Sequence, residues 1–102
     1  MNSKKALAML GMATRAGKTV SGEFAVEQSV KQGTARLVLL AEDASDNTKK
    51  KFSNMCSYRT LPCLFLGDKE TLGKAIGKEF RACVAVEDEN LSKVIMGHIS
   101  SN

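Results

Sequence analysis

Apolar residues recur at helical spacing in five stretches of this chain, and short apolar runs separate these stretches. In the first stretch Ala6, Leu7 and Leu10 fall on one face, which predicts a helix over residues 4–15. Ser3 is its predicted N-cap, and Gly17 ends it. The same spacing predicts helices over residues 22–33, 46–57 and 68–77, and a last helix that starts at 88 or 90.

The starts and inner faces of the four later helices can also be read from the sequence. Small or acidic residues that suit a helix start precede each of them. The predicted starts are Gly22, Ser45, Asp68 and either Asp88 or Asn90. The predicted inward-facing residues are Val26, Val30 and, beside them, Phe24; Phe52, Met55 and Cys56; Leu72 and Ile76; and Leu91, Val94 and Ile95.

Four short apolar runs predict strands over residues 18–21, 36–41, 63–66 and 82–87. The second run has no alternation of apolar and polar residues, so we expect both faces of that strand to be covered. Helices and strands alternate along the chain, which predicts an α/β fold with a mixed sheet of about four strands and helices on both faces. At 102 residues, without a linker or repeat, the chain is expected to form one domain, residues 1–102.

Composition narrows the classes of function. The net charge is +4, with 15 Lys and Arg against 11 Asp and Glu, a mild excess that suits nucleic acid or an anionic surface as partner. Cys56, Cys63 and Cys83 form no Cys-x-x-Cys pair and only one His is present, so we expect free buried thiols and no zinc. No run approaches the roughly 20 apolar residues that span a bilayer, and we expect a cytoplasmic protein.

The sequence offers little support for catalysis. Residues 13–19 look like the end of a phosphate-binding P-loop, but Met12 stands where that motif needs a glycine. The segment also follows a predicted helix, whereas a P-loop follows a strand. The acidic clusters 42–43 and 87–89 are typical of helix starts, and no nucleophile–base pair is visible. These features indicate a binding module without a cofactor, and not an enzyme.

A loop between the fourth helix and the fourth strand is the most informative segment. It reads Lys78-Glu79-Phe80-Arg81, with an aromatic residue between two cations. Such a side chain can stack on an unpaired base while the cations hold neighbouring phosphates. Alternatively, Phe80 folds back onto the core and leaves both cations solvated. Several further cations are expected near this loop and the loop 42–48, from the set Lys18, Lys49, Lys50, Lys51, Lys69 and Lys74. For Lys49 to Lys51 the alternative is that they form only the solvated side of a helix.

Longer motifs carry a resemblance to a known family. They include Arg15-Ala16-Gly17-Lys18, Ser21-Gly22, the segment 33–44, Pro62, and Leu72-Gly73-x-Ala75-x-Gly77-Lys78-x-Phe80-Arg81. In these motifs the chain resembles the ribosomal protein L7Ae/L30e superfamily, and most of all its small bacterial YlxQ-type members. The resemblance implies a three-layer α/β/α sandwich, structured kink-turn RNA such as ribosomal RNA as partner, no metal, and a monomer.

The family grips RNA with three pieces, and the resemblance places them on this chain. The first is a helix start with the pattern Gly-x-Asn-Glu-x-x-Lys, where Phe24, Ala25 and Gln28 here replace Asn, Glu and Lys. The second is the loop 42–45, and the third is the loop 78–81. The implied RNA-binding residues are Gly22, Glu23, Phe24, Gln28, Ser45, Lys49, Lys69, Lys78, Phe80 and Arg81.

The altered first piece leaves two hypotheses from different classes. The first is a non-catalytic RNA-binding protein of the ribosomal type, favoured by Phe80 and Arg81. The alternative is a protein-interaction module that kept the fold and lost the kink-turn site, favoured by the changes at 24–28.

Overall fold

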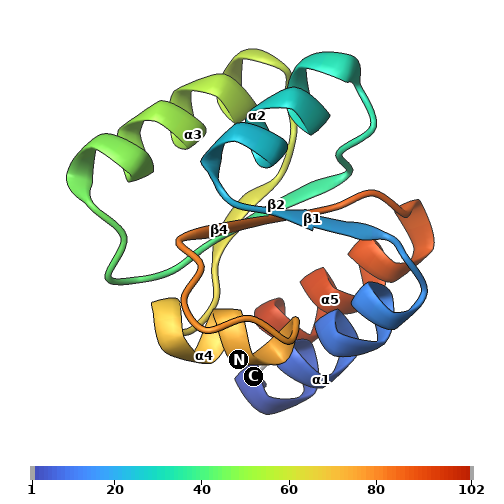
Figure 1. Cartoon of the computed structure of the whole chain (residues 1–102). Coiled ribbons are helices and arrows are strands. Elements are labelled where there is room, and N and C mark those ends of the chain that lie inside the picture. Colours follow the sequence, from blue (N-terminus) through green and yellow to red (C-terminus); the bar gives the residue numbers. More distant parts are fainter. Residues whose placement is uncertain (1, 102) are drawn as a thin grey trace.

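The computed structural model describes residues 2–101, and in this part of the chain five helices alternate with four strands (Figure 1). This is the predicted order of elements. The helices are α1 (Ser3–Arg15), α2 (Glu23–Gln32), α3 (Asp46–Tyr58), α4 (Lys69–Ala75) and α5 (Glu89–Ser100). The strands are β1 (Thr19–Ser21), β2 (Leu37–Leu40), β3 (Cys63–Phe65) and β4 (Cys83–Val86).

The strands form one mixed sheet in the order β1-β4-β2-β3. Strand β4 pairs antiparallel with both β1 and β2, whereas β2 and β3 pair in parallel. The C-terminal ends of β1, β2 and β3 therefore meet the N-terminal end of β4 at one end of the sheet. Helices α2, α3 and α4 begin there, so we call it the helix-start end; it lies at the left of Figure 1.

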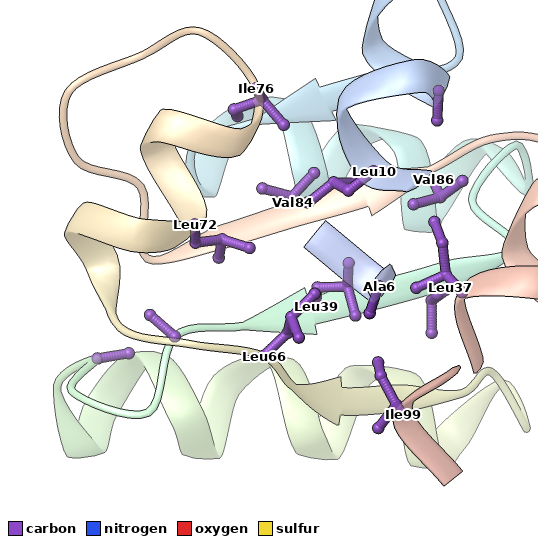
Figure 2. Packing of buried hydrophobic residues seen from close by; sticks show 14 residues of the cluster. Ala6, Leu10, Leu37, Leu39, Leu66, Leu72, Ile76, Val84, Val86 and Ile99 are labelled. Carbon is purple, nitrogen blue, oxygen red and sulfur yellow. The ribbon is translucent and has the colours of Figure 1, made fainter. Parts of the chain in front are cut away.

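Helices cover both faces of the sheet, as the sequence predicts. Residues Val84 and Val86 of β4 point to the face covered by α1, α4 and α5, and Cys83 and Ala85 point to the face covered by α2 and α3. All four residues of β2 are also buried. Because each strand residue meets a packed layer, a continuous apolar run replaces the alternation of a half-exposed strand. The molecule is thus a three-layer α/β/α sandwich (Figure 1), and Figure 2 shows the buried cluster that contains Leu10, Leu39, Leu72 and Val84.

Most helix starts are where the sequence predicts them. Gly22, Ser45, Asp68 and Asp88 are the N-caps of α2 to α5, and Gly33 closes α2 in the left-handed conformation. The prediction for α1 was wrong by one residue, because the side chain of Asn2, and not Ser3, accepts the cap hydrogen bond from the Lys5 N–H.

Two predicted core residues lie on the surface instead. Phe24 is 78% exposed because it follows the N-cap of α2 and shares the outer face with Gln28, opposite the buried Val26. Val94 is 42% exposed, and the buried positions of α5 are Ser92, Ile95 and Ile99. In both helices, fewer apolar residues are buried against the sheet than the sequence pattern predicts.

The three cysteines are free thiols, and two of them are fully buried. Burial raises the pKa of Cys83 to about 12. Cys63 is only half-buried, which corrects the expectation of full burial, and its contact with Cys56 raises the pKa of the Cys56 thiol. Within residues 2–101 no cluster of three metal-ligating side chains occurs. None of the helices in these residues has the length and apolar character needed to cross a membrane.

Candidate nucleic-acid interface

The three segments implied by the family resemblance all lie at the helix-start end (Figure 1). The start of α2 follows β1, the loop 41–45 follows β2, and the loop 76–82 leads into β4. The mixed topology explains this, since β4 runs opposite to the other three strands and its entry loop joins their exits. The start of α2 packs against α3, and the loop 76–82 packs on α4. The loop 41–45 contacts both sides, because Ser45 caps α3 and Asp43 bonds to the N–H of Lys69.

At the start of α2 the backbone is fixed, and an aromatic side chain faces outward. Gly22 has a φ of +91°, a conformation that disfavours residues with a Cβ, and its N–H donates to the carbonyl of Cys83 at 3.1 Å. The N-cap glycine offers no side-chain hydrogen bond to the helix. Phe24 is exposed on the outer face, and the partly buried Gln28 lies one turn further along the same face.

Glu23 points to α3 instead. Its carboxylate accepts a hydrogen bond at 3.2 Å from the hydroxyl of Thr48, which in turn accepts one at 2.9 Å from the hydroxyl of Ser45. The Ser45 hydroxyl also accepts from the Thr48 N–H at 3.1 Å and thereby caps α3. The predicted site residues Glu23 and Ser45 are therefore brought together, and both bond to Thr48 of α3.

A second polar contact joins the same two helices. The ammonium of Lys51 lies 2.7 Å from one carboxylate oxygen of Glu27 and 4.0 Å from Glu23. Lys31 also pairs with Glu27 at 2.8 Å. Hydrogen bonds from Lys31 and Lys51 lower the pKa of Glu27 to about 2. The charges of Glu23, Glu27, Lys31 and Lys51 thus have partners within the protein.

The loop before β4 is held by its backbone. The N–H of Lys78 donates to the carbonyl of Gly73 at 2.8 Å, and the N–H of Arg81 donates to the carbonyl of Lys69 at 3.1 Å. A Cβ on Gly73 would lie 2.6 Å from the carbonyl oxygen of Glu79, so only glycine lets the loop pack this closely on α4. The structure thus explains why a glycine stands at position 73 of the motif Leu72-Gly73, which the family resemblance alone did not explain.

This loop presents Phe80 to solvent, with 59% of the residue exposed. The alternative in which Phe80 folds back onto the core is wrong, because Phe80 is exposed and does not belong to the buried cluster that contains Leu72 and Ile76. The Arg81 guanidinium uses Nε to donate to the hydroxyl of Ser21 at 3.0 Å and Nη1 to donate to the carbonyl of Phe80 at 2.7 Å.

Further contacts place the two remaining cations. The N–H of Lys69 donates to a carboxylate oxygen of Asp43 at 2.8 Å, which ties the loop after β2 to the start of α4. Lys49 lies in the first turn of α3, where its N–H donates to the carbonyl of Ser45 at 2.9 Å, and its ammonium lies 5.7 Å from the centre of the Phe65 ring at the end of edge strand β3. The sequence predicted that Lys49 lies near the loop 42–48, but it gave no sign of Phe65 as its neighbour.

The sequence did not predict which residues connect the three segments by hydrogen bonds. Ser21, Asp43 and Thr48 each bond to a residue far away in the chain. Local patterns predict helix caps, but they carry no signal for a hydroxyl or carboxylate that links separate loops. The position of Asp43 directly after a buried strand is the one hint that the sequence contains.

Comparisons with known proteins agree with this architecture. Residues 4–96 match the model of the ribosomal protein L7Ae/L30e/S12e/Gadd45 family. The RNA-binding protein YlxQ of Bacillus subtilis is 43% identical over 88 residues, which cover 86% of this chain and 88% of that protein. The large ribosomal subunit protein eL8 of Thermoplasma volcanium is 29% identical over 102 aligned residues, which cover 95% of this chain and 84% of that protein.

A solved structure gives the same result for the fold. A protein with unknown function from Bacillus halodurans is 36% identical and superposes with a TM-score of 0.92, covering 95% of this chain and 98% of the other. The family match spans most of the chain, and the fold agrees with that of the solved relative. The chain belongs to the ribosomal protein L7Ae/L30e/S12e/Gadd45 family.

Proposed function

We propose that residues 1–102 form a single, non-catalytic RNA-binding domain that recognises structured RNA of the kink-turn kind. The observation that carries this proposal is the exposed Phe80, which stands between Lys78 and Arg81 on a loop fixed to α4. An aromatic ring offers a face to an unpaired base, and adjacent cations suit the phosphates on either side. The names of the relatives, an RNA-binding protein and a ribosomal protein, support the same class of ligand.

The rest of the helix-start end fits such a ligand. The starts of α2 and α3 direct backbone N–H groups and the positive ends of two helix dipoles to this end. Phosphates can bind there without a base-specific side chain, which positions the RNA but does not read its sequence. Lys69, Lys78 and Arg81 would add charge-assisted contacts on the α4 side.

Several companion proposals follow from the same class of function. The RNA would be structured RNA such as ribosomal RNA, and the protein would act in the cytoplasm as a monomer. Neither a metal nor a cofactor is needed, because binding rests on stacking, hydrogen bonds and charge.

A second candidate function is a protein-interaction module on the same fold. It is favoured by the start of α2, where Phe24 is exposed and the carboxylate of Glu23 is already engaged by Thr48. Exposed aromatic residues are enriched at protein interfaces as well as at nucleic-acid sites. This candidate predicts that the chain binds no RNA at low salt.

One titration series separates the two candidates. We expect measurable affinity for a kink-turn duplex at low salt, and weaker affinity for a straight duplex of equal length. The logarithm of the binding constant should fall with the logarithm of salt by roughly 0.7–0.9 for each phosphate contact. If neither RNA binds at low salt, the RNA proposal fails and the protein-interaction candidate takes its place.

A further inference from the structure

Two of the three free thiols lie against each other on the α2–α3 face of the sheet, away from the helix-start end. Cys56 belongs to the last turn of α3, and Cys63 is the first residue of edge strand β3. Cys63 packs against the buried cluster that contains Cys56, and a hydrogen bond joins the two thiols. Cys56 is 1% exposed, whereas Cys63 is only half-buried, so one sulfur of the pair can be reached from solvent.

The turn after α3 brings the two sulfurs together. The carbonyl of Cys56 accepts hydrogen bonds from the N–H of Arg59 at 3.1 Å and from the N–H of Leu61 at 2.9 Å, so the chain folds back over the end of the helix. It then enters β3, where Cys63 pairs with Val38 of β2. The contact between the thiols therefore depends on the packing of α3 on the sheet, and not only on a short separation in sequence.

The surroundings give the two thiols different chemistry. The hydrogen bond with Cys56 lowers the pKa of the Cys63 thiol, and the same hydrogen bond, together with burial, raises the pKa of Cys56. Cys63 is therefore the sulfur that more readily becomes a thiolate, the form that attacks an electrophile. A partly exposed thiolate beside a second thiol is the arrangement in which cysteines are oxidised reversibly.

We propose that Cys56 and Cys63 form a site of reversible oxidation, which hydroperoxides convert to an intramolecular disulfide. The first step occurs at Cys63. Its thiolate attacks one oxygen of the hydroperoxide, the O–O bond breaks, and the other oxygen leaves as hydroxide or alkoxide and takes a proton from water. Cys63 then carries a sulfenic acid, and the peroxide has gained two electrons from its sulfur.

The second step uses Cys56. Its sulfur attacks the sulfur of Cys63, the S–O bond breaks, and the hydroxide that leaves takes the Cys56 proton and departs as water. Over both steps each sulfur loses one electron, and a disulfide joins the end of α3 to the edge strand. Two equivalents of a low-molecular-weight thiol reduce this disulfide by exchange and become a disulfide themselves.

Cys83 provides an internal comparison, because it belongs to the same buried cluster. It is fully buried in β4, and burial raises its pKa to about 12. Its thiol should therefore not react with a peroxide while the chain is folded. Exposure and a neighbouring thiol, and not membership of the cluster, distinguish the reactive pair.

The experiment treats the reduced, folded chain with hydrogen peroxide, unfolds it in the presence of an alkylating reagent and digests it with trypsin. Trypsin cleaves after Arg59, which lies between the two cysteines, so the disulfide joins two peptides that otherwise separate. We expect the intact chain to lose two hydrogens, the peptides of Cys56 and Cys63 to be linked, and Cys83 to remain free. Dithiothreitol should release both peptides.

Three variants separate the roles of the sulfurs. In Cys56→Ala the sulfenic acid on Cys63 has no partner, so a 1,3-dione that traps sulfenic acids should label Cys63. In Cys63→Ala both the link and the label should fall to the background of the untreated chain, because Cys56 is buried. Cys83→Ala is the matched control, since it also removes a buried cysteine of the cluster, and its 56–63 link should form as in wild type.

Wild type alone can overturn the proposal, so the test holds even where Cys56→Ala does not fold. The proposal fails if the treated chain contains no link between Cys56 and Cys63, if its disulfides join two chains, or if Cys83 is oxidised as fast as Cys63. Because an unfolded chain can form the same link, the reaction is repeated in urea. A link that forms no faster in the folded chain than in urea also overturns the proposal, because the fold would then contribute nothing.

Discussion

The helix-start end has two sides that use similar residues in different ways. On the α2–α3 side, side chains bond to one another: Glu23 to Thr48, and Glu27 to Lys51. On the α4 side, the loop is held by backbone hydrogen bonds to the carbonyls of Gly73 and Lys69. Each side also exposes one phenylalanine, Phe24 and Phe80 respectively.

This difference indicates which side of the helix-start end contributes more free energy to RNA binding. A side chain already bonded inside the protein must give up that partner before it binds RNA, and the exchange cancels most of the gain. A loop that is held by its backbone leaves Lys78 and Phe80 available in a fixed geometry, which lowers the cost of ordering on binding. We therefore expect the α4 side to dominate the affinity and the α2–α3 side to modify it.

The largest effect is expected from Gly73→Ala. The added Cβ would lie 2.6 Å from the carbonyl oxygen of Glu79, so the loop must move away from α4. We expect a loss of about 1–3 kcal/mol in the free energy of unfolding, the usual cost of overpacking. Affinity for RNA should fall further than with any single side-chain loss in the loop, because Lys78, Phe80 and Arg81 move together.

The matched control for this variant is Gly97→Ala. Gly97 also lies within a helix, α5, but an added Cβ there meets no atom within 4 Å. This change should raise the free energy of unfolding by about 0.5–1 kcal/mol, because alanine favours a helix over glycine. Chemical denaturation and one RNA titration measure both variants, and equal affinities for the two would show that the loop position does not matter.

The next largest effect is expected from Phe80→Ala. Loss of one stack on a base should weaken RNA binding by roughly 1–3 kcal/mol. Stability should change less, because 59% of Phe80 is already exposed in the free protein. The matched control is Tyr58→Ala, at the far end of α3, where an even more exposed ring should be irrelevant to RNA. An unfolded Phe80→Ala variant, or a folded one with full affinity, would contradict the stacking role.

The sequence predicts the fold of this chain far better than its site. Continuous apolar strands such as β2, and local caps such as Ser45 and Asp68, depend on neighbouring residues and could be read directly. Exposure depends on which side of an element faces the core, and Phe24 and Val94 were therefore misplaced.

Links across the chain have no local pattern at all. The bond between Arg81 and Ser21 joins residues sixty positions apart, and the contact of Lys49 with Phe65 depends on the edge position of β3. The family resemblance named the segments that meet at the helix-start end. It did not show that the carboxylate of Glu23 is turned toward α3.

A smaller effect is expected when the family pattern is restored on the α2–α3 side. The triple variant Phe24→Asn, Ala25→Glu and Gln28→Lys regains side chains that can read base edges at the sheared G·A pairs of a kink-turn. We expect its preference for a kink-turn over a straight duplex to rise by about 1–3 kcal/mol for each regained bidentate contact. Little packing is lost, since Phe24 is 78% exposed.

The measurement compares wild type and the triple variant on RNAs with and without the G·A pairs. The RNA that lacks the pairs is the control, because Ala25→Glu and Gln28→Lys change the charge in opposite directions and leave the net charge, and with it the non-specific attraction to phosphates, unchanged. If a folded variant shows the same ratio of affinities as wild type, this surface does not face the kink, and the α4 side binds the RNA alone.

The smallest effect concerns the ion pairs between α2 and α3. Hydrogen bonds from Lys31 and Lys51 hold the pKa of Glu27 at about 2, below its ordinary value of 4.5. A carboxylate with a lowered pKa stabilises the fold above the higher value, and this contribution is lost as the pH falls from about 4.5 to about 2. Titration of the Glu27 side-chain carboxyl by NMR should show this midpoint, and Lys51→Met should raise it while Lys31 keeps it below 4.5.

The same variant tests the comparison between the two sides. Lys51 is turned toward Glu27 and Glu23, so its removal should change RNA affinity far less than Phe80→Ala does. Lys31→Met is the matched control, because it removes the other partner of Glu27 without touching the contact between helices. Suppose instead that Lys51→Met weakens RNA binding as much as Phe80→Ala while Lys31→Met does not. Lys51 would then leave its carboxylates to contact RNA, and the α2–α3 side would carry as much of the affinity as the loop on α4.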